Sequence, residues 1–84
     1  MSSPNIQVLR RTISPTPSVA QMQTLLTPFE AGDTAQCIED CHAFIQKFPN
    51  HYFGYKLLGV CYEQMEDWEQ AIRWMEKAKQ LSPD

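Results

Sequence analysis

The sequence predicts an all-α chain of two antiparallel helix–turn–helix hairpins. First, residues recur at an offset of 34, as in Asp33 with Asp67 and Pro49 with Pro83. Second, apolar residues recur three and four positions apart, which is the spacing of one helix face. Third, a capping residue followed by glutamine three positions later precedes several of the apolar runs. The four predicted helices lie near residues 18–31, 33–48, 51–65 and 67–82.

Length and composition indicate one small globular domain and limit the kind of partner it can bind. The 84 residues suffice for one small domain, and 43% hydrophobic with 20% charged residues is compatible with a globular fold. The net charge is -3, and the only cluster of basic residues is Arg10-Arg11. Because binding to phosphates needs a basic surface, we expect no nucleic-acid ligand.

Hydropathy and cysteine content suggest the compartment. There is no apolar run approaching the roughly 20 residues that span a bilayer, and residues 1–18 lack the apolar block of a signal peptide. The three cysteines are an odd number and imply no disulfide framework. We therefore expect a cytoplasmic protein with reduced thiols and no membrane partner.

Residues 1–17 are predicted to be a flexible leader, and residues 18–84 to be the helical domain. Pro15 and Pro17 stand at alternate positions, which excludes a helix there and favours an extended linker. The domain then divides into a first repeat at 18–50 and a second at 51–84.

The first helix should begin after Ser18, because Ser18 with Gln21 forms a capping-box pattern. Its apolar face consists of Met22, Leu25, Leu26 and Phe29. Pro28 should kink the last turn or end its regularity, since proline lacks the amide hydrogen and clashes with the preceding turn. Gly32 supplies the left-handed stop.

The remaining helices follow the same logic. Asp33 with Gln36 and Asp67 with Gln70 cap the second and fourth helices. The apolar face of the second helix consists of Cys37, Ile38, Cys41, Phe44, Ile45 and Phe48, and that of the fourth of Ala71, Ile72, Met75, Ala78 and Leu81. Pro49-Asn50 and Pro83 mark the helix ends.

The third and fourth helices carry a specific motif. It places Tyr55, Leu58, Gly59 and Tyr62 as aromatic-x-x-Leu-Gly-x-x-Tyr, and Ala71, Met75, Ala78 and Pro83 follow it. This pattern resembles the tetratricopeptide repeat, a 34-residue helix–turn–helix unit. The resemblance implies that the two hairpins stack as a short right-handed solenoid. The resemblance covers about residues 18–83. The resemblance is weaker in the first helix, which aligns with the third helix at an offset of 33 and not 34. This offset predicts that the turn after the first helix is one residue shorter.

Small residues explain why the motif packs. Gly59, Ala71 and Ala78 let paired helices approach closely, and larger side chains fill the remaining space. Substituting Gly59 with leucine is predicted to overpack this contact.

The resemblance implies a protein or peptide partner bound in a groove lined by the first helix of each repeat. In the third helix the implied partner-binding residues are Phe53, Lys56, Leu57, Val60, Glu63 and Gln64, and in the first helix they are Gln23, Thr24, Thr27 and Glu30. Leu57 and Val60 could equally cover the core. Lys56 stands alone in this groove, so the paired Lys, Asn and Arg by which some members bind a carboxylate terminus are missing.

Two repeats are fewer than the three usually needed for a stable array. Further repeats beyond the chain end, self-association or partner binding could complete the structure. Trp74 lies off the Ala71–Met75–Ala78 face, which suggests possible self-association or else an indole lying flat on its own surface. An alternative function is an N-terminal docking or regulatory segment of a larger, possibly enzymatic, protein.

Chemistry is the least supported class of function. Cys37 and Cys41 share a helix face and form a minor candidate for a thiol or metal site, but small buried residues are the better interpretation. The sequence has no phosphate-binding glycine loop, no His-Glu-x-x-His and no nucleophile motif. We therefore predict no enzyme activity, no metal and no cofactor.

Overall fold

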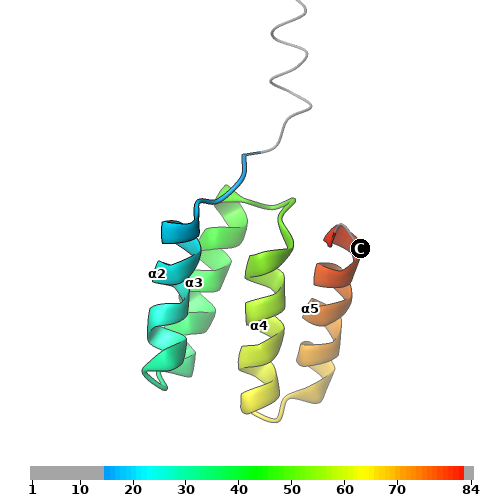
Figure 1. The fold of residues 1–84 in the computed structure, drawn as a ribbon. Coiled ribbons are helices and arrows are strands. Elements are labelled where there is room, and N and C mark those ends of the chain that lie inside the picture. Colours follow the sequence, from blue (N-terminus) through cyan, green and yellow to red (C-terminus); the bar gives the residue numbers. More distant parts are fainter. Residues whose placement is uncertain (1–14, 83–84) are drawn as a thin grey trace, which may run out of the picture.

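The computed structural model describes residues 15–82, which form four helices and no strand (Figure 1). The helices are α2 (Val19–Glu30), α3 (Thr34–Lys47), α4 (Tyr52–Gln64) and α5 (Trp68–Leu81). We call the α2–α3 hairpin repeat one and the α4–α5 hairpin repeat two. The all-α class and the four predicted helices are confirmed, with boundaries within one residue of those expected.

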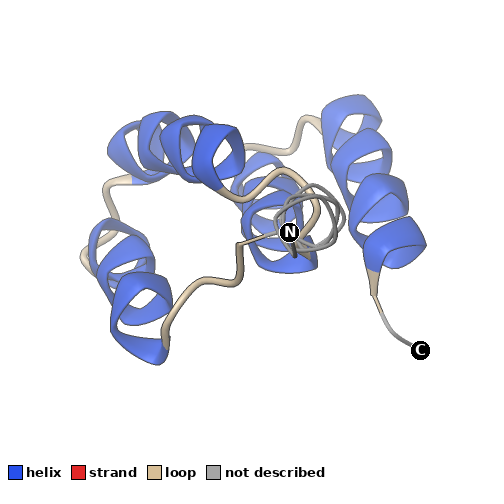
Figure 2. Ribbon diagram, turned by 90° about the horizontal axis from the view of Figure 1, so that it is seen from above, coloured by secondary structure: helices blue, strands red, loops and turns tan. Residues whose placement is uncertain are grey.

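The helices stand side by side, with repeat one at one end of the row and α5 at the other (Figures 1 and 2). Most of the predicted leader, and Pro83, lie outside the described residues. At the end of the leader, Pro17 is buried.

Side-chain caps fix where the helices begin. Ser18 and Gln21 form the predicted capping box, in which the Ser18 amide donates to Gln21 Oε1 at 2.8 Å and the Gln21 amide donates to Ser18 Oγ at 3.1 Å. The carboxylates of Asp33 and Asp67 accept from the amides three residues later. His51 caps α4 through Nδ1, which accepts from the Phe53 amide at 3.2 Å and was not expected from the sequence.

The turns within the two repeats have the same length and conformation. Gly32 and Glu66 both have a positive φ, 82° and 60°, and each amide donates to the carbonyl three residues back. The left-handed stop at Gly32 is confirmed. The predicted shorter first turn is wrong: the missing residue is in the helix, since α2 has 12 residues and α4 has 13.

Pro28 lies inside α2, and the helix continues through it to Glu30. The Ala31 amide still donates to the Thr27 carbonyl at 3.1 Å, so the last turn keeps its helical bonding. A proline this close to a helix end removes one hydrogen bond only, and the chain accommodates it before the turn.

The core runs across both repeats and centres on α4. The fully buried side chains are those of Leu58, Cys37, Cys41 and Cys61. α4 contributes six buried residues, whereas α2 contributes only Leu25. Repeat one therefore depends on α4 for much of its buried surface.

The predicted close approach between α4 and α5 is confirmed. Gly59, Ala71 and Ala78 are buried. A Cβ on Gly59 would lie 2.8 Å from Met75 Cγ and 3.3 Å from the Ala71 carbonyl oxygen. A larger residue there would have to displace the Met75 side chain and would press on the Ala71 carbonyl of α5.

A second close approach, between α3 and α4, was not predicted. Gly54 is buried, and a Cβ there would lie 2.9 Å from Phe44 Cδ1 and 3.0 Å from Ile45 Cγ1. Gly54 thus lets the two repeats meet as closely as Gly59 lets the helices of repeat two meet.

Candidate partner-binding face

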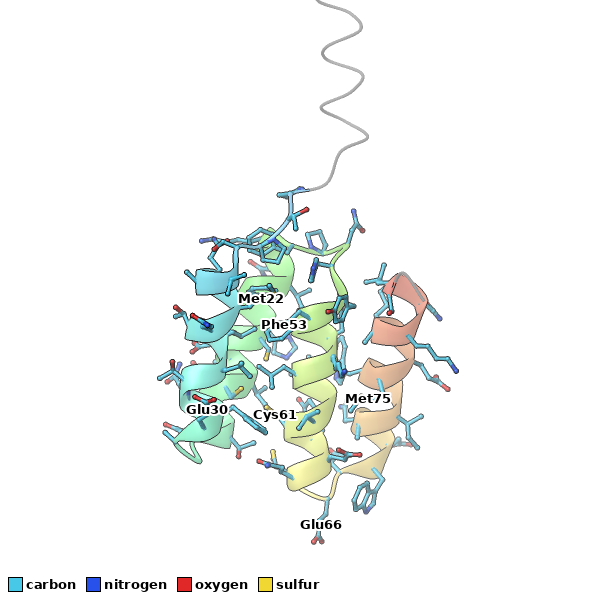
Figure 3. The ribbon with its side chains drawn as sticks, in the orientation of Figure 1. Met22, Glu30, Phe53, Cys61, Glu66 and Met75 are labelled. Carbon is cyan, nitrogen blue, oxygen red and sulfur yellow. The ribbon has the colours of Figure 1, made fainter. Side chains whose placement is uncertain are left out.

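The side of the molecule formed by α2 and α4 carries a strip of half-buried apolar side chains. The strip consists of Met22, Leu26 and Phe29 from α2 with Phe53 and Val60 from α4. All of these except Val60 pack against the buried core cluster. Figure 3 shows Met22 and Phe53 on the neighbouring sides of the two helices. We call this surface the α2/α4 face.

The predicted partner-binding residues of α4 divide into three groups by exposure. Leu57 is only 6% exposed and belongs to the core cluster, so the interpretation that it covers the core is correct. Phe53 and Val60 are half-buried, and the Phe53 ring lies 6.1 Å from that of Phe44. The exposed residues are Lys56, Glu63 and Gln64.

Lys56 lies away from α2. It lines a hollow of about 220 Å³ between α4 and α5, together with Tyr52, Met75 and Lys79. The lone groove lysine expected from the sequence therefore belongs to a different surface from Phe53.

The predicted contact residues of α2 are all exposed and polar: Gln23, Thr24, Thr27 and Glu30. The Thr24 and Thr27 hydroxyls donate to the carbonyls of Ala20 and Gln23, at 2.9 and 3.3 Å. The sequence pattern predicted these polar residues as partner contacts and placed Met22, Leu26 and Phe29 on the apolar face of the helix. Their partial exposure follows from the sparse packing of α2, which the sequence does not reveal.

A larger hollow, of about 450 Å³, lies between α2 and α3 and was not predicted. Ala20, Thr24 and Leu25 line it from α2, and Asp40, Ala43 and Phe44 are among the residues lining it from α3. At the offset of 34, Asp40 and Ala43 correspond to Trp74 and Lys77, whose large side chains stand in the same place in repeat two.

Trp74 lies between the repeats, not on an outer surface. Its indole stacks on Tyr55 at 6.0 Å and meets the His42 ring edge-on at 5.8 Å, and Lys77 Nζ lies 5.8 Å from the Tyr55 ring centroid. Trp74 Nε1 is buried and has no hydrogen-bond partner among the described residues. The premise for self-association through Trp74, an uncovered indole, does not hold.

Tyr55 anchors this group. Its hydroxyl donates to the Pro49 carbonyl at 2.7 Å, which ties α4 to the connection between the repeats. Burial raises the pKa of the Tyr55 phenol, so the hydroxyl stays a donor.

The three cysteines meet in the core where α3 contacts α4. Burial raises the pKa of Cys61 to about 12 and that of Cys41 further, and each is raised again by the neighbouring Cys37. Cys37 Sγ lies 3.9 Å from the Leu25 carbonyl oxygen, to which it donates. Within residues 15–82 no group of three His, Cys, Asp or Glu side chains is arranged to hold a metal. All three cysteine side chains are fully buried in the core, where a free thiol packs as a small apolar side chain.

None of the helices in the described part of the chain is long and apolar enough to cross a membrane.

Comparison with known families matches residues 52–84 to the model of the tetratricopeptide repeat. This repeat is in general a module for protein interaction and is typically not catalytic. Searches of curated proteins and of solved structures gave no significant match.

Proposed function

We propose that this chain, in which residues 52–84 are a tetratricopeptide repeat, binds a segment of another protein on its α2/α4 face. The observation that carries the proposal is the apolar strip on that face. Its five side chains are large and half-buried, and both helices contribute to it. Four of them, all except Val60, are held in place by the core cluster, and all five still offer surface to a partner.

The strip favours a partner segment with apolar side chains on one side. An amphipathic helix presents such side chains three and four residues apart, and an extended peptide presents them at alternate positions. Phe53 is the central anchor, because its ring is fixed against Phe44 on one side and is partly open on the other.

The charges around the strip favour a basic partner. Glu30 and Glu63 are exposed near the C-terminal ends of α2 and α4, which lie at the same end of the molecule (Figure 1). Helix C-termini are themselves negative. A Lys or Arg next to the apolar residues of the partner would therefore add to binding there.

Selection of peptides from a random library, followed by calorimetric titration, tests the proposal. We expect the selected peptides to combine apolar residues at helical or alternate spacing with basic residues. Val60→Glu places a charge in the strip and should weaken their binding roughly tenfold or more. Gln46→Glu adds the same charge at an exposed position of α3 outside the face and should leave binding unchanged.

Circular dichroism of both variants separates lost binding from lost folding. If the selected peptides bind the folded Val60→Glu variant as tightly as they bind the unchanged chain, their binding site is not the α2/α4 face. Selection of acidic peptides without apolar residues would also contradict the proposed chemistry.

A further inference from the structure

The hollow between α2 and α3 lies in repeat one, at one end of the helix row. It measures about 450 Å³. The buried side chains of Leu25, Phe44 and Phe48 line it, together with two exposed alanines, Ala20 and Ala43, so much of its lining is apolar. We call it the α2/α3 hollow. An apolar recess of this size offers a surface against which another segment of chain can pack.

In repeat two, α3 covers the equivalent surface. A Cβ on Gly54 of α4 would touch two side chains of α3, and Trp74 of α5 contacts His42. Gly54 corresponds to Gln21 at the offset of 33 that relates α2 to α4. Trp74 corresponds to Asp40 at the offset of 34 that relates α3 to α5. Since Gln21 and Asp40 both line the α2/α3 hollow, a segment that preceded α2 as α3 precedes α4 would lie across it.

The chain ahead of α2 is long enough for such a segment. Residues 48–51 connect α3 to α4, and residues 15–18 precede α2 with the same spacing. The residues 1–14 before them, which lie outside the described part of the chain, suffice for a segment as long as α3, which has 14 residues. Ala20, in the first turn of α2, lines the hollow, so these residues join the domain beside it.

The sequence of this segment has an apolar pattern that suits the hollow. Ile6, Leu9 and Ile13 are three and four positions apart, which is the spacing of one helix face. Pro4 and Pro15 stand before and after the pattern, where proline is compatible with a helix between them. A helix this short is marginal in water by itself and needs a surface to pack against. The α2/α3 hollow provides such a surface.

We propose that residues 6–13 of the chain's own leader fold back over the α2/α3 hollow, with Ile6, Leu9 and Ile13 against its apolar lining. The segment then covers repeat one as α3 covers repeat two, and the flexible part of the predicted leader shortens to the connection before α2. It also adds packing to α2, whose only buried residue is Leu25. The hollow shares no residue with the apolar strip of the α2/α4 face, so this inference does not rest on partner binding.

Nuclear Overhauser effects in the full chain, with labelled methyl groups, test the proposal. We expect cross-peaks from the Leu9 methyls to the methyls of Ala20 and Ala43, because both alanines line the hollow at exposed positions. Such cross-peaks arise only between protons a few ångströms apart. The amides of residues 6–13 should also exchange with solvent roughly tenfold or more slowly than they do when the contact is broken.

Two variants break the contact from its two sides. Leu9→Glu places a charge on the segment, and Ala43→Glu places one in the hollow. Either should remove the cross-peaks between the isoleucines of the segment and Ala20, and should return the amides of residues 6–13 to fast exchange. Ala43 is exposed and Leu9 precedes all four helices, so both variants should keep the helical domain. A retained cross-peak between the rings of Trp74 and Tyr55 checks this.

Two matched variants serve as controls. Gln7→Glu adds the same charge to the segment, off the side that carries Ile6, Leu9 and Ile13. Gln46→Glu adds it to an exposed position of α3 outside the hollow. Both controls should keep the cross-peaks and the slow exchange of the unchanged chain.

Three results would overturn the proposal. A full chain with no cross-peak between residues 6–13 and the hollow leaves the hollow uncovered. Cross-peaks that survive Ala43→Glu place the segment on another surface. In a mixture of labelled and unlabelled chains, cross-peaks between different molecules would mean that the segment enters the hollow of a second copy and not its own.

Discussion

Repeat one and repeat two share their capping aspartates and their three-residue turns, but their interiors are filled differently. In repeat two, Gly59 brings α5 close to α4, and Trp74 fills the remaining space against Tyr55. In repeat one, Asp40 stands where Trp74 would be, and a hollow is left beside it. The 34-residue period determines the turns, whereas the volume of individual side chains determines how tightly each hairpin closes.

The difference also assigns the source of stability. The buried residues of repeat one, including Cys37, Cys41 and Phe44, lie in one cluster with Leu58 and Cys61 of α4. Repeat one is therefore stabilised mainly by its contact with repeat two, and less by contact between its own helices. Four experiments, three with substitutions and one with pH, test whether the two repeats differ in this way.

The largest effect is expected from Trp74→Ala, at about 3 kcal/mol of unfolding free energy. The substitution removes an indole that contacts both Tyr55 and His42. The matched change in repeat one, Asp40→Ala, borders an existing hollow and should cost less than about 0.5 kcal/mol. Urea denaturation measures both, and equal losses would mean that the two interiors are filled alike.

Adding volume should have opposite effects in the two repeats. Gly59→Leu would drive a side chain into Met75 and should cost about 2 kcal/mol. Ala43→Leu adds bulk beside the hollow of repeat one and should be neutral or stabilising by about 0.5 kcal/mol. Urea denaturation is the measurement, and destabilisation by Ala43→Leu would show that the hollow cannot accept a side chain.

Alkaline pH tests the junction between the repeats. The pKa of Cys61 is raised to about 12, well above the value near 8.5 in an unfolded chain. Between these values the unfolded state loses a proton that the folded state keeps, so stability falls as pH rises, by about 1.4 kcal/mol per pH unit for each such thiol. Denaturation from pH 8 to 9.5 should show this fall.

Cys61→Ala is the control for the pH experiment, because it removes one of the titrating thiols and should make the fall shallower. A stability that does not change with pH in this range would mean that the thiols are already open to solvent. In that case repeat one would not be held by α4.

The smallest effect concerns the turns. Glu66 adopts the left-handed conformation that glycine adopts at Gly32, which costs a non-glycine residue about 1–2 kcal/mol. Gly32→Glu should therefore destabilise the chain by about 1 kcal/mol. Glu66→Gly should stabilise it by about 0.5 kcal/mol, because part of the relief is offset by the greater freedom of glycine when unfolded. Thermal denaturation resolves the sign, and two changes in the same direction would contradict the equivalence of the turns.

Much of the fold could be predicted because its signals are local. Ser18, Asp33 and Asp67 mark helix starts by their own chemistry, and Gly59 belongs to a motif of known spacing. Gly54 was missed because its role depends on α3 lying against it, which is a contact between distant segments. A glycine inside a helix is unfavourable by about 0.5–1 kcal/mol, and that cost was the available clue.

The candidate site was predicted less well for the same reason. A helical wheel places Trp74 off the Ala71–Met75–Ala78 face but does not show that Tyr55 and His42 lie against it. It also places Met22 and Phe29 on the apolar face of the first helix, and their partial exposure becomes evident only from the sparse packing of α2. Of the α4 residues that the prediction named, Phe53 and Val60 lie in the half-buried apolar strip, in the helix where the repeat motif is strongest.

The two tryptophans lie in different environments and can serve as intrinsic fluorescence probes. Trp68 stands in water at one end, while the indole nitrogen of Trp74 is sealed between the hairpins. Their emission should separate by wavelength. The longer-wavelength emission should come from the exposed Trp68 at the start of α5, and the shorter-wavelength emission from Trp74 between the two repeats. Events at either place can then be followed without attaching a dye.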